Sequence, residues 1–154
     1  MTEKKQKAQG QKTPGPTPRQ LARIAAAQAL FQQDFNKVTP ARLILDFRQN
    51  YLEPNTDEIL FAQLVDAAAE RLPELDAIIS ANLSEGWTIE RIDPVLRAIL
   101  RVGIAELMVM PDVPARVVIT EYVDVAHAFF GGKEPGMVNG LLDKVARTLR
   151  DAEF

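Results

Sequence analysis

The 154-residue chain has an ordinary globular composition, with 47% apolar and 25% charged residues, and its length suits about one domain. It contains no cysteine, which excludes disulfides, thiolate zinc sites, iron–sulfur clusters and cysteine nucleophiles. The longest apolar run is far shorter than the roughly 18 residues of a membrane-spanning helix, and residues 1–20 lack the apolar region of a signal peptide. We therefore expect a cytoplasmic protein that does not enter a membrane.

The net charge of −3 conceals a basic N-terminal arm on an acidic body. Residues 1–23 carry 6 basic side chains and one acid, Glu3, whereas the remaining 131 residues carry 12 basic and 20 acidic groups. Such an arm is typical of proteins that bind a polyanion, nucleic acid first. A solvated tail that only keeps a protein soluble has the same composition, and composition alone slightly favours that interpretation.

The N-terminal arm, residues 1–17, consists mainly of Lys, Gln, Gly, Thr and Pro and has almost nothing to bury, so we expect it to be disordered. Helical periodicity begins at Pro18 and continues to Phe35. One side of this helix carries a stripe formed by Leu21, Ile24, Gln28, Phe31 and Phe35. The neighbouring side is rich in alanine, which would let another helix approach closely.

Six further helices are predicted downstream. The second begins at Pro40, the third after an expected cap at Thr56, the fourth at Pro73, the fifth covers 94–110, the sixth 118–129 and the seventh 138–149. Gly131-Gly132 and Pro135-Gly136 are expected to form the last loop. No segment alternates as a strand would, so we predict an all-α bundle of about seven helices over residues 18–151.

Three charged residues interrupt the fifth helix, which is otherwise apolar nearly all round and is therefore expected in the middle of the bundle. They are Arg97, Arg101 and Glu106. A buried charge is costly unless it is paired, so each must have a partner or reach the surface. Ion pairs between helices, which would fix the register of the bundle, are favoured over a binding face.

Catalytic and metal-binding patterns are missing from the sequence. His127 is the only histidine, no cysteine accompanies it, and no glycine-rich nucleotide loop is present. Glu70, Glu74 and Asp76 follow one another closely but have the character of a solvated helix end. We expect no metal, no cofactor and no enzymatic activity.

Arg19 and Arg23 are four residues apart and thus share one side of the first helix, directly after the basic arm. They could form a compact phosphate-binding stripe at the start of that helix, or they could be an ordinary solvated face. Taken together with the arm, they favour RNA or DNA binding.

Several motifs resemble the NusB family of bacterial transcription antitermination factors. They read R-x-x-A-R-x-x-A-x-Q-A-L-F from Arg19 to Phe31, W-x-x-E-R-I and R-x-I-L-R-x-G-x-x-E-L between Trp87 and Leu107, V-P-x-x-V-x-I-x-E from Val113, and V-N-G-L-L-D-K from Val138 to Lys144. The motifs come in the family's order and cover roughly residues 17–150. The arm is not part of the resemblance.

The resemblance implies an all-α fold of two small helical subdomains without catalysis. It also implies binding of the boxA element of nascent RNA together with the small-subunit ribosomal protein NusE. With other Nus factors, such proteins help the RNA polymerase elongation complex to read through terminators, notably in ribosomal RNA operons. Whether the free protein forms a homodimer stays open.

By this resemblance, the RNA surface comprises Arg19, Arg23 and the stretch from Lys133 to Asn139, including Met137. The NusE face comprises Phe31, at the family's usual Tyr position, and Glu90. Met137 stands where the family commonly has Phe, and Gly136 stands where Lys is frequent. These departures remove one aromatic plane and one charge from the loop.

Structural roles compete with some of these assignments. Asn139 as a helix cap and Gly140 as a close-packing residue are favoured over direct RNA contact, and Trp87 and Phe129 are expected in the core rather than as stacking platforms. A helical protein–protein adaptor without RNA binding is the alternative function. A NusB-like domain also precedes the catalytic domain of certain ribosomal RNA cytosine methyltransferases, but the cofactor loop and cysteines of that domain are missing here.

Overall fold

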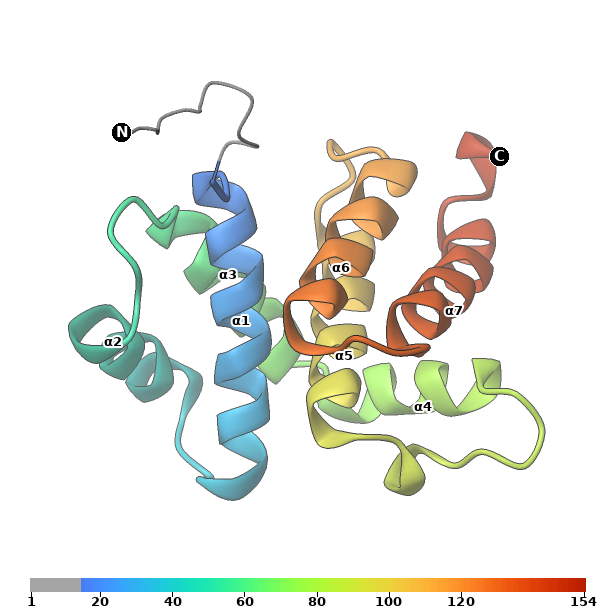
Figure 1. Cartoon of the computed structure of the whole chain (residues 1–154), viewed down its shortest axis with the longest axis horizontal. Helices are drawn as coiled ribbons and strands as arrows, with labels where there is room; N and C mark the ends of the chain where they lie inside the picture. The colour runs from blue at the N-terminus through green and yellow to red at the C-terminus, as the bar shows by residue number, and fades with distance from the viewer. Residues whose placement is uncertain (1–14) are drawn as a thin grey trace, which may run out of the picture.

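Seven α-helices form the computed structural model, which describes residues 15–154 (Figure 1). No strand occurs in this part of the chain, so the predicted all-α fold is confirmed. The predicted arm lies outside the described residues except for its last three positions. In chain order the elements are α1 (Pro18–Phe35), α2 (Pro40–Asn50), α3 (Glu58–Ala69), α4 (Leu72–Asn82), the 3-10 helix η1 (Ile89–Arg91), α5 (Pro94–Val109), α6 (Ala115–Phe129), α7 (Glu134–Leu149) and the 3-10 helix η2 (Asp151–Glu153).

The helices form two groups that meet along α1 and α5 (Figure 1). The first group contains α1, α2 and α3, and the second contains α4, α5, α6 and α7. Helix α5 contacts α1, α3, α4, α6 and α7, and every residue from 98 to 107 is buried. The apolar fifth helix therefore lies in the middle of the bundle, as its composition predicts, and the two groups are the expected subdomains.

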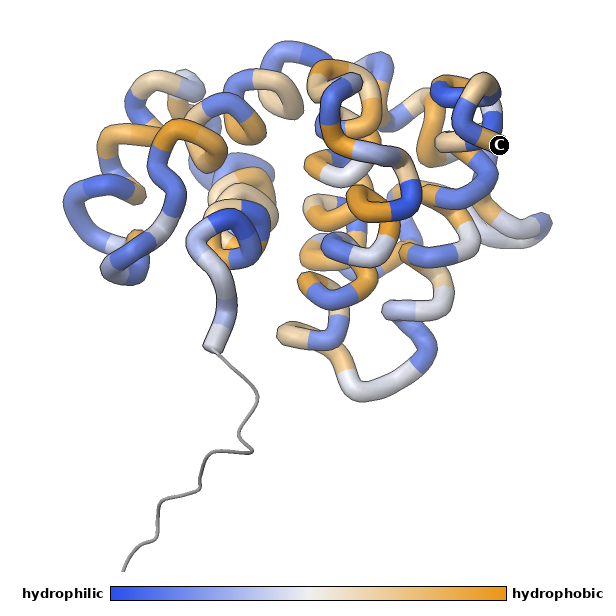
Figure 2. The backbone as a smooth tube through the Cα atoms, turned by 90° about the horizontal axis from the view of Figure 1, so that it is seen from above, coloured by the Kyte–Doolittle hydropathy of each residue, from blue (hydrophilic) through white to orange (hydrophobic). Residues whose placement is uncertain are grey.

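Helix α1 packs with its alanine-rich side, not with the stripe of large residues. Its buried residues are Ala22, Arg23, Ala25, Ala26, Ala27, Ala29 and Leu30. The stripe from Leu21 to Phe35 is only partly covered and borders a groove described below. Small side chains let α1 lie close to α3 and α5, so the expectation of close helix approach is confirmed. Figure 2 shows the alternation of hydrophobic and hydrophilic residues along the helices.

Polar caps set most helix starts. Thr17 and Gln20 form a reciprocal capping box at α1, and Thr39 caps α2. The predicted cap of α3 at Thr56 is wrong, because the Thr56 hydroxyl donates to the Glu53 carbonyl at 2.7 Å. Asp57 accepts from the Leu60 amide at 3.0 Å and is the cap. A carboxylate is the better acceptor for the positive end of a helix.

Helix α7 begins earlier than predicted. It starts at Glu134, with Pro135 in its first turn, where a proline loses no hydrogen bond. The predicted loop at Pro135-Gly136 is therefore wrong. Asn139 lies inside the helix rather than at its cap, and a Cβ on Gly140 would meet nothing within 4 Å, so neither structural role expected for this pair is found.

Close packing is instead found at Gly103 of α5. A Cβ there would lie 3.1 Å from Leu142 Cδ1 and 3.3 Å from Tyr122 Cγ. This glycine lets α5 approach α6 and α7 at the centre of the second group. Within residues 15–154, no helix has the length and apolar character needed to cross a membrane.

Candidate nucleic-acid and partner interfaces

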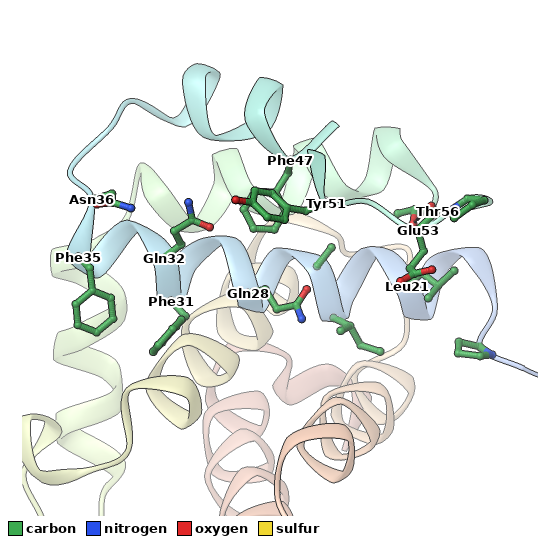
Figure 3. Close-up of a pocket in the computed structure, with 14 residues that line it drawn as sticks. Leu21, Gln28, Phe31, Gln32, Phe35, Asn36, Phe47, Tyr51, Glu53 and Thr56 are labelled. Carbon is green, nitrogen blue, oxygen red and sulfur yellow. Dashed lines mark hydrogen bonds between the residues drawn. The ribbon is translucent and has the colours of Figure 1, made fainter. Parts of the chain in front are cut away.

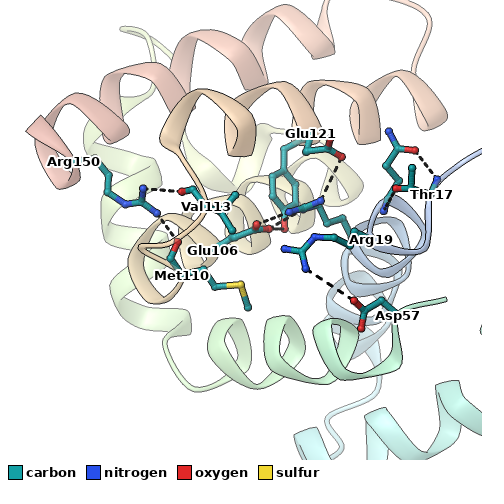
Figure 4. A network of polar contacts seen from close by, with 11 residues as sticks. Thr17, Arg19, Asp57, Glu106, Met110, Val113, Glu121 and Arg150 are labelled. Atoms are coloured by element: carbon teal, nitrogen blue, oxygen red, sulfur yellow. Dashed lines mark hydrogen bonds and ion pairs between the residues drawn. The ribbon is translucent and has the colours of Figure 1, made fainter. Parts of the chain in front are cut away.

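Arg23 is buried and does not belong to an exposed basic stripe. Only 2% of the residue is exposed. Its Nε and Nη2 donate to the two carboxylate oxygens of Glu106 at 2.9 and 2.7 Å, and Nη1 lies 3.4 Å from Oε1 of Glu121 (Figure 4). The Tyr122 hydroxyl also donates to Glu106, at 2.7 Å. The prediction that Arg23 faces solvent is wrong, because Arg23 lies on the buried side of α1 and neutralises the buried Glu106.

The surroundings hold Arg23 and Tyr122 each in one protonation state. Burial alone lowers the pKa of Arg23, but its hydrogen bonds to Glu106 and the charges of Glu106 and Glu121 outweigh burial and raise that pKa. Burial raises the pKa of Tyr122 well above 10.0, and the charge of Glu106 adds to this effect. Arg23 thus stays charged and Tyr122 stays protonated.

The other charged residues of α5 are paired in the same way. Arg97 lies 3.2 Å from Asp34, and Arg101 lies 2.9 Å from Asp34 and 2.8 Å from Asp76. With the Arg23–Glu106 pair, these contacts confirm that the charges of the fifth helix form ion pairs between helices. Asp76 is accordingly part of a salt bridge and not of a solvated acidic cluster.

Arg19 is the member of the predicted stripe that reaches solvent. Its side chain is 50% exposed, and its Nη1 lies 4.0 Å from Oδ2 of Asp57 (Figure 4). It borders the connection between α5 and α6, beside Pro111 and Asp112. A long ion pair at an exposed position holds an arginine weakly, so Arg19 is available to a phosphate.

Lys133 and Met137 lie together beside a cavity of about 410 Å³ between the end of α4 and the start of α7. Lys133 is exposed, Met137 is half-buried, and Asn139 is exposed but does not border the cavity. The cavity is lined by Asn82, Leu83, Ser84, Lys133, Gly136, Met137, Gly140, Leu141 and Lys144. Of the predicted RNA-binding residues, Lys133 and Met137 thus line this cavity, whose α4 side was not predicted.

The two cationic surfaces are far apart. The first turn of α1, which carries Arg19, lies at the top of the view in Figure 1, whereas the connection between α6 and α7, which carries Lys133, crosses the middle of the view below α6. One RNA that contacts both surfaces must therefore run along the molecule.

Phe31 and Glu90, the predicted partner residues, lie on elements that Arg97 joins to each other, the last part of α1 and η1. Phe31 is half-buried and packs edge-on against Phe35, with ring centroids 5.1 Å apart. Glu90 is exposed in η1. Arg97 joins η1 to the last turn of α1, because its guanidinium donates both to the Ile89 carbonyl and to the Asp34 carboxylate. The expected partial exposure of Phe31 is confirmed.

A groove of about 820 Å³ runs along the large-residue side of α1 and faces α2 (Figure 3). Leu21, Gln28, Phe31 and Phe35 border it from α1, and Phe47 and Tyr51 border it from α2. Phe31 therefore lies on the wall of an open apolar groove rather than on an isolated patch.

Two aromatic residues expected in the core are at the surface. Trp87 is 42% exposed and Phe129 is 36% exposed. Trp87 and Lys144 were not among the predicted site residues, although Gly136, Gly140 and Lys144 follow one another at intervals of four and so lie on one side of a helix.

No cluster of three or more His, Cys, Asp or Glu side chains able to hold a metal occurs among residues 15–154.

The fold is that of the all-helical antitermination factors of known structure. It matches Thermotoga maritima NusB with a TM-score of 0.73 and 29% identity, covering 86% of this chain and 93% of that one. It also matches a chain of a crystal structure of the antitermination factors NusB and NusE in complex with dsRNA. That match has a TM-score of 0.73 and 29% identity and covers 85% of this chain and 97% of the other.

Sequence comparison gives the family. The NusB family model matches residues 20–147. Transcription antitermination protein NusB of Sphingopyxis alaskensis is 42% identical over 140 residues, which cover 86% of this chain and 94% of that protein. The NusB protein of Novosphingobium aromaticivorans is 44% identical over 141 residues, which cover 86% and 95%. The chain belongs to the NusB family.

Proposed function

We propose that this protein is a bacterial transcription antitermination factor that binds boxA-type nascent RNA together with NusE. It promotes processive transcription of ribosomal RNA operons as part of an RNA polymerase elongation complex with other Nus factors. The observation that carries the proposal is the match over nearly the whole length of a chain whose crystal structure contains NusB, NusE and dsRNA. The role is one of binding in the cytoplasm, without catalysis and without a cofactor.

The RNA surface has two parts in this proposal. Arg19 contacts phosphate at the start of α1, where free backbone amides and the positive end of the helix add to its charge. Lys133, Met137 and Asn139 contact RNA at the start of α7. Arg23 does not touch RNA, since it is buried, but its pair with Glu106 holds the first turns of α1 in place.

The NusE face lies on Phe31 and Glu90. A half-buried aromatic on a groove wall can serve as an anchor for a partner, because it buries further area without a large cost in conformational freedom. Glu90 supplies an exposed negative charge nearby, which favours a basic partner.

Filter binding of a boxA RNA at several salt concentrations, with and without NusE, tests the proposal. We expect tight binding with a steep salt slope, because each phosphate contact releases counterions. Changing Arg19 to Ala should weaken binding about five-fold or more and reduce the slope by about one unit. The helical protein–protein adaptor would instead bind NusE and show no RNA affinity at any salt concentration.

Arg48 provides a matched control for Arg19. Its side chain is 43% exposed and lies 3.5 Å from Glu58, much as Arg19 lies beside Asp57. Arg48→Ala removes the same charge from an exposed helix on the other side of the first group and should leave RNA binding unchanged. Equal losses for both variants would mean that Arg19 acts only through net charge.

A further inference from the structure

An exposed indole and two lysines surround the cavity between α4 and α7. Lys133 Nζ lies 5.3 Å from the centroid of the Trp87 ring. Lys144, one helical turn beyond Gly140, donates from Nζ to the Asn82 carbonyl at 3.1 Å. Lys133 and Lys144 both line the cavity, and no carboxylate is among its lining residues. The cavity therefore combines positive charge with an aromatic surface at its edge.

The wall formed by α7 is open because it carries two glycines. A Cβ on Gly136 or on Gly140 would meet nothing within 4 Å. Both glycines line the cavity and are separated by one helical turn, so a flat group can approach the backbone of α7 there. Met137, on the same wall, offers a flexible thioether rather than an aromatic plane.

Trp87 is held beside the cavity by a tight turn. Its backbone N–H donates to the Ser84 carbonyl at 3.0 Å, and Ser84 lines the cavity. Gly86 within this turn has a φ of 88°, which favours glycine. With 42% of its surface exposed, Trp87 retains free indole area for a ligand while its position is fixed by the backbone.

The acidic residues nearby lie outside this lining. Glu85 is exposed in the turn before Trp87, and Glu134 is half-buried in the first turn of α7, facing Gly132. Neither borders the cavity. Lys133 and Lys144 thus give the cavity a positive lining on an otherwise acidic body, which favours a phosphate-bearing ligand.

We propose that Trp87, Lys133 and Lys144 form a subsite for one nucleotide of single-stranded RNA. The base stacks on the Trp87 indole, Lys133 moves from the ring to the adjacent phosphate, and Lys144 contacts the next phosphate across the open wall of α7. Stacking requires a base that is free of a duplex, and an aromatic beside cations is the common arrangement for such bases. The subsite rests on the proposed RNA-binding function and adds residues that the predicted RNA surface lacks.

Trp87 reports on this subsite directly, because it is the only tryptophan in the chain. Titration of the full-length protein with a single-stranded boxA RNA should quench its fluorescence with the same midpoint as binding measured by anisotropy of labelled RNA. Inorganic polyphosphate, which has charge but no bases, should bind weakly and leave most of the emission unchanged.

Variants separate stacking from charge. Trp87→Ala should weaken boxA RNA binding about ten-fold, whereas Trp87→Phe should restore most of the affinity, because it keeps an aromatic plane. Lys133→Gln and Lys144→Gln should each reduce the salt slope by about one unit. Phe154→Ala removes another exposed aromatic side chain that has a cation over its ring, and Lys37→Gln removes another exposed lysine charge. Both positions lie away from the cavity, and both variants should bind RNA normally.

The outcomes distinguish this inference from the function on which it rests. RNA binding that leaves Trp87 emission unchanged, with Trp87→Ala binding normally, overturns the subsite while the antitermination function stands. Loss of affinity in Trp87→Ala without rescue by Trp87→Phe, and without quenching in the unmodified protein, also overturns stacking. If the chain binds no boxA RNA, alone or with NusE, the subsite and the proposed function both fail.

Discussion

Glu106 is completely buried in α5, and its carboxylate is satisfied by three donors. Two come from the Arg23 guanidinium and one from the Tyr122 hydroxyl. A buried carboxylate without such partners would cost several kcal/mol, on the order of the penalty measured for uncompensated ions. The cluster therefore stabilises the fold mainly by leaving no charge unpaired.

Arg23→Ala should destabilise the protein by about 3–5 kcal/mol, because it leaves Glu106 buried without its counter-charge. Urea unfolding followed by circular dichroism measures the change. Arg19→Ala serves as the control and should stay within about 0.5 kcal/mol, since Arg19 is half exposed and its contact with Asp57 is long. A loss below about 1 kcal/mol for Arg23→Ala would contradict the role given to this pair.

Tyr122 makes the free energy of unfolding depend on pH. Burial and Glu106 raise its pKa well above 10.0 in the folded state, whereas the unfolded chain titrates near that value. The folded state then binds the proton more tightly, so this contribution to stability is fully present below about pH 10 and falls as the pH rises further. Above about pH 10, the free energy of unfolding of Tyr122→Phe should fall less steeply with pH than that of the unmodified protein. Parallel curves for the two proteins would refute the assignment.

At the scale of elements, ion pairs at both ends fix the antiparallel register of α1 and α5. Arg23 near the start of α1 meets Glu106 near the end of α5, and Asp34 near the end of α1 meets Arg97 and Arg101 in the first half of α5. Helix α1 faces α5 with alanines, whose small and similar side chains specify register poorly. The charged residues at both ends supply the register that the alanines cannot.

Gly103→Ala should destabilise the protein by about 1–2 kcal/mol. The new methyl group would lie 3.1 Å from Leu142 and 3.3 Å from Tyr122, whose ring is held by its bond to Glu106, so overpacking exceeds the gain in helix propensity. Gly140→Ala is the matched control in α7, where a Cβ meets nothing, and it should stabilise by about 0.5–1 kcal/mol. Thermal unfolding of both variants tests the contrast. Stabilisation by Gly103→Ala would show that the Leu142 side chain moves aside to make room for the methyl group.

The helices were predictable from sequence because their signals are local. Periodicity, prolines in first turns and polar caps all act within a few residues, so the seven elements follow from the chain itself. The side of α1 that meets the core was less apparent. Large apolar residues from Leu21 to Phe35 suggested one side, whereas Arg23 lies with Ala26, Ala27 and Leu30 on the buried one.

The exposed site was harder to predict because it joins segments distant in sequence. The local sequence suggests the surface for Arg23, because nothing near it indicates that Glu106, 83 residues away, is its partner. Trp87 was expected in the core rather than as a stacking platform, but the turn after α4 places it at the edge of a cavity bordered by α7. The sequence offered one signal for this cavity, which is the spacing of Gly136, Gly140 and Lys144 at intervals of four on one side of a helix.

At the scale of the whole molecule, the proposed RNA surface is extended rather than compact. The first turn of α1 lies at the top of the view in Figure 1, whereas the start of α7 lies near the middle of the view, with α6 between the two helices. The Arg23 cluster and the Asp34 pairs hold α1 to α5, and α5 also contacts α7. The spacing of the two surfaces is therefore a fixed property of the bundle.

A rigid spacing predicts how losses of RNA affinity combine. Arg19 lies beside Asp57 and Lys133 lies over the Trp87 ring, so the two side chains share no partner. The effects of Arg19→Ala and Lys133→Gln on the binding free energy of a long boxA RNA should therefore add to within about 0.5 kcal/mol. Filter binding of the two single variants and the double variant measures this. Shortening the RNA from one end should abolish the effect of one substitution while the other persists, because a short strand reaches only one surface. If both substitutions lose their effect at the same RNA length, the two surfaces do not bind one strand along the molecule.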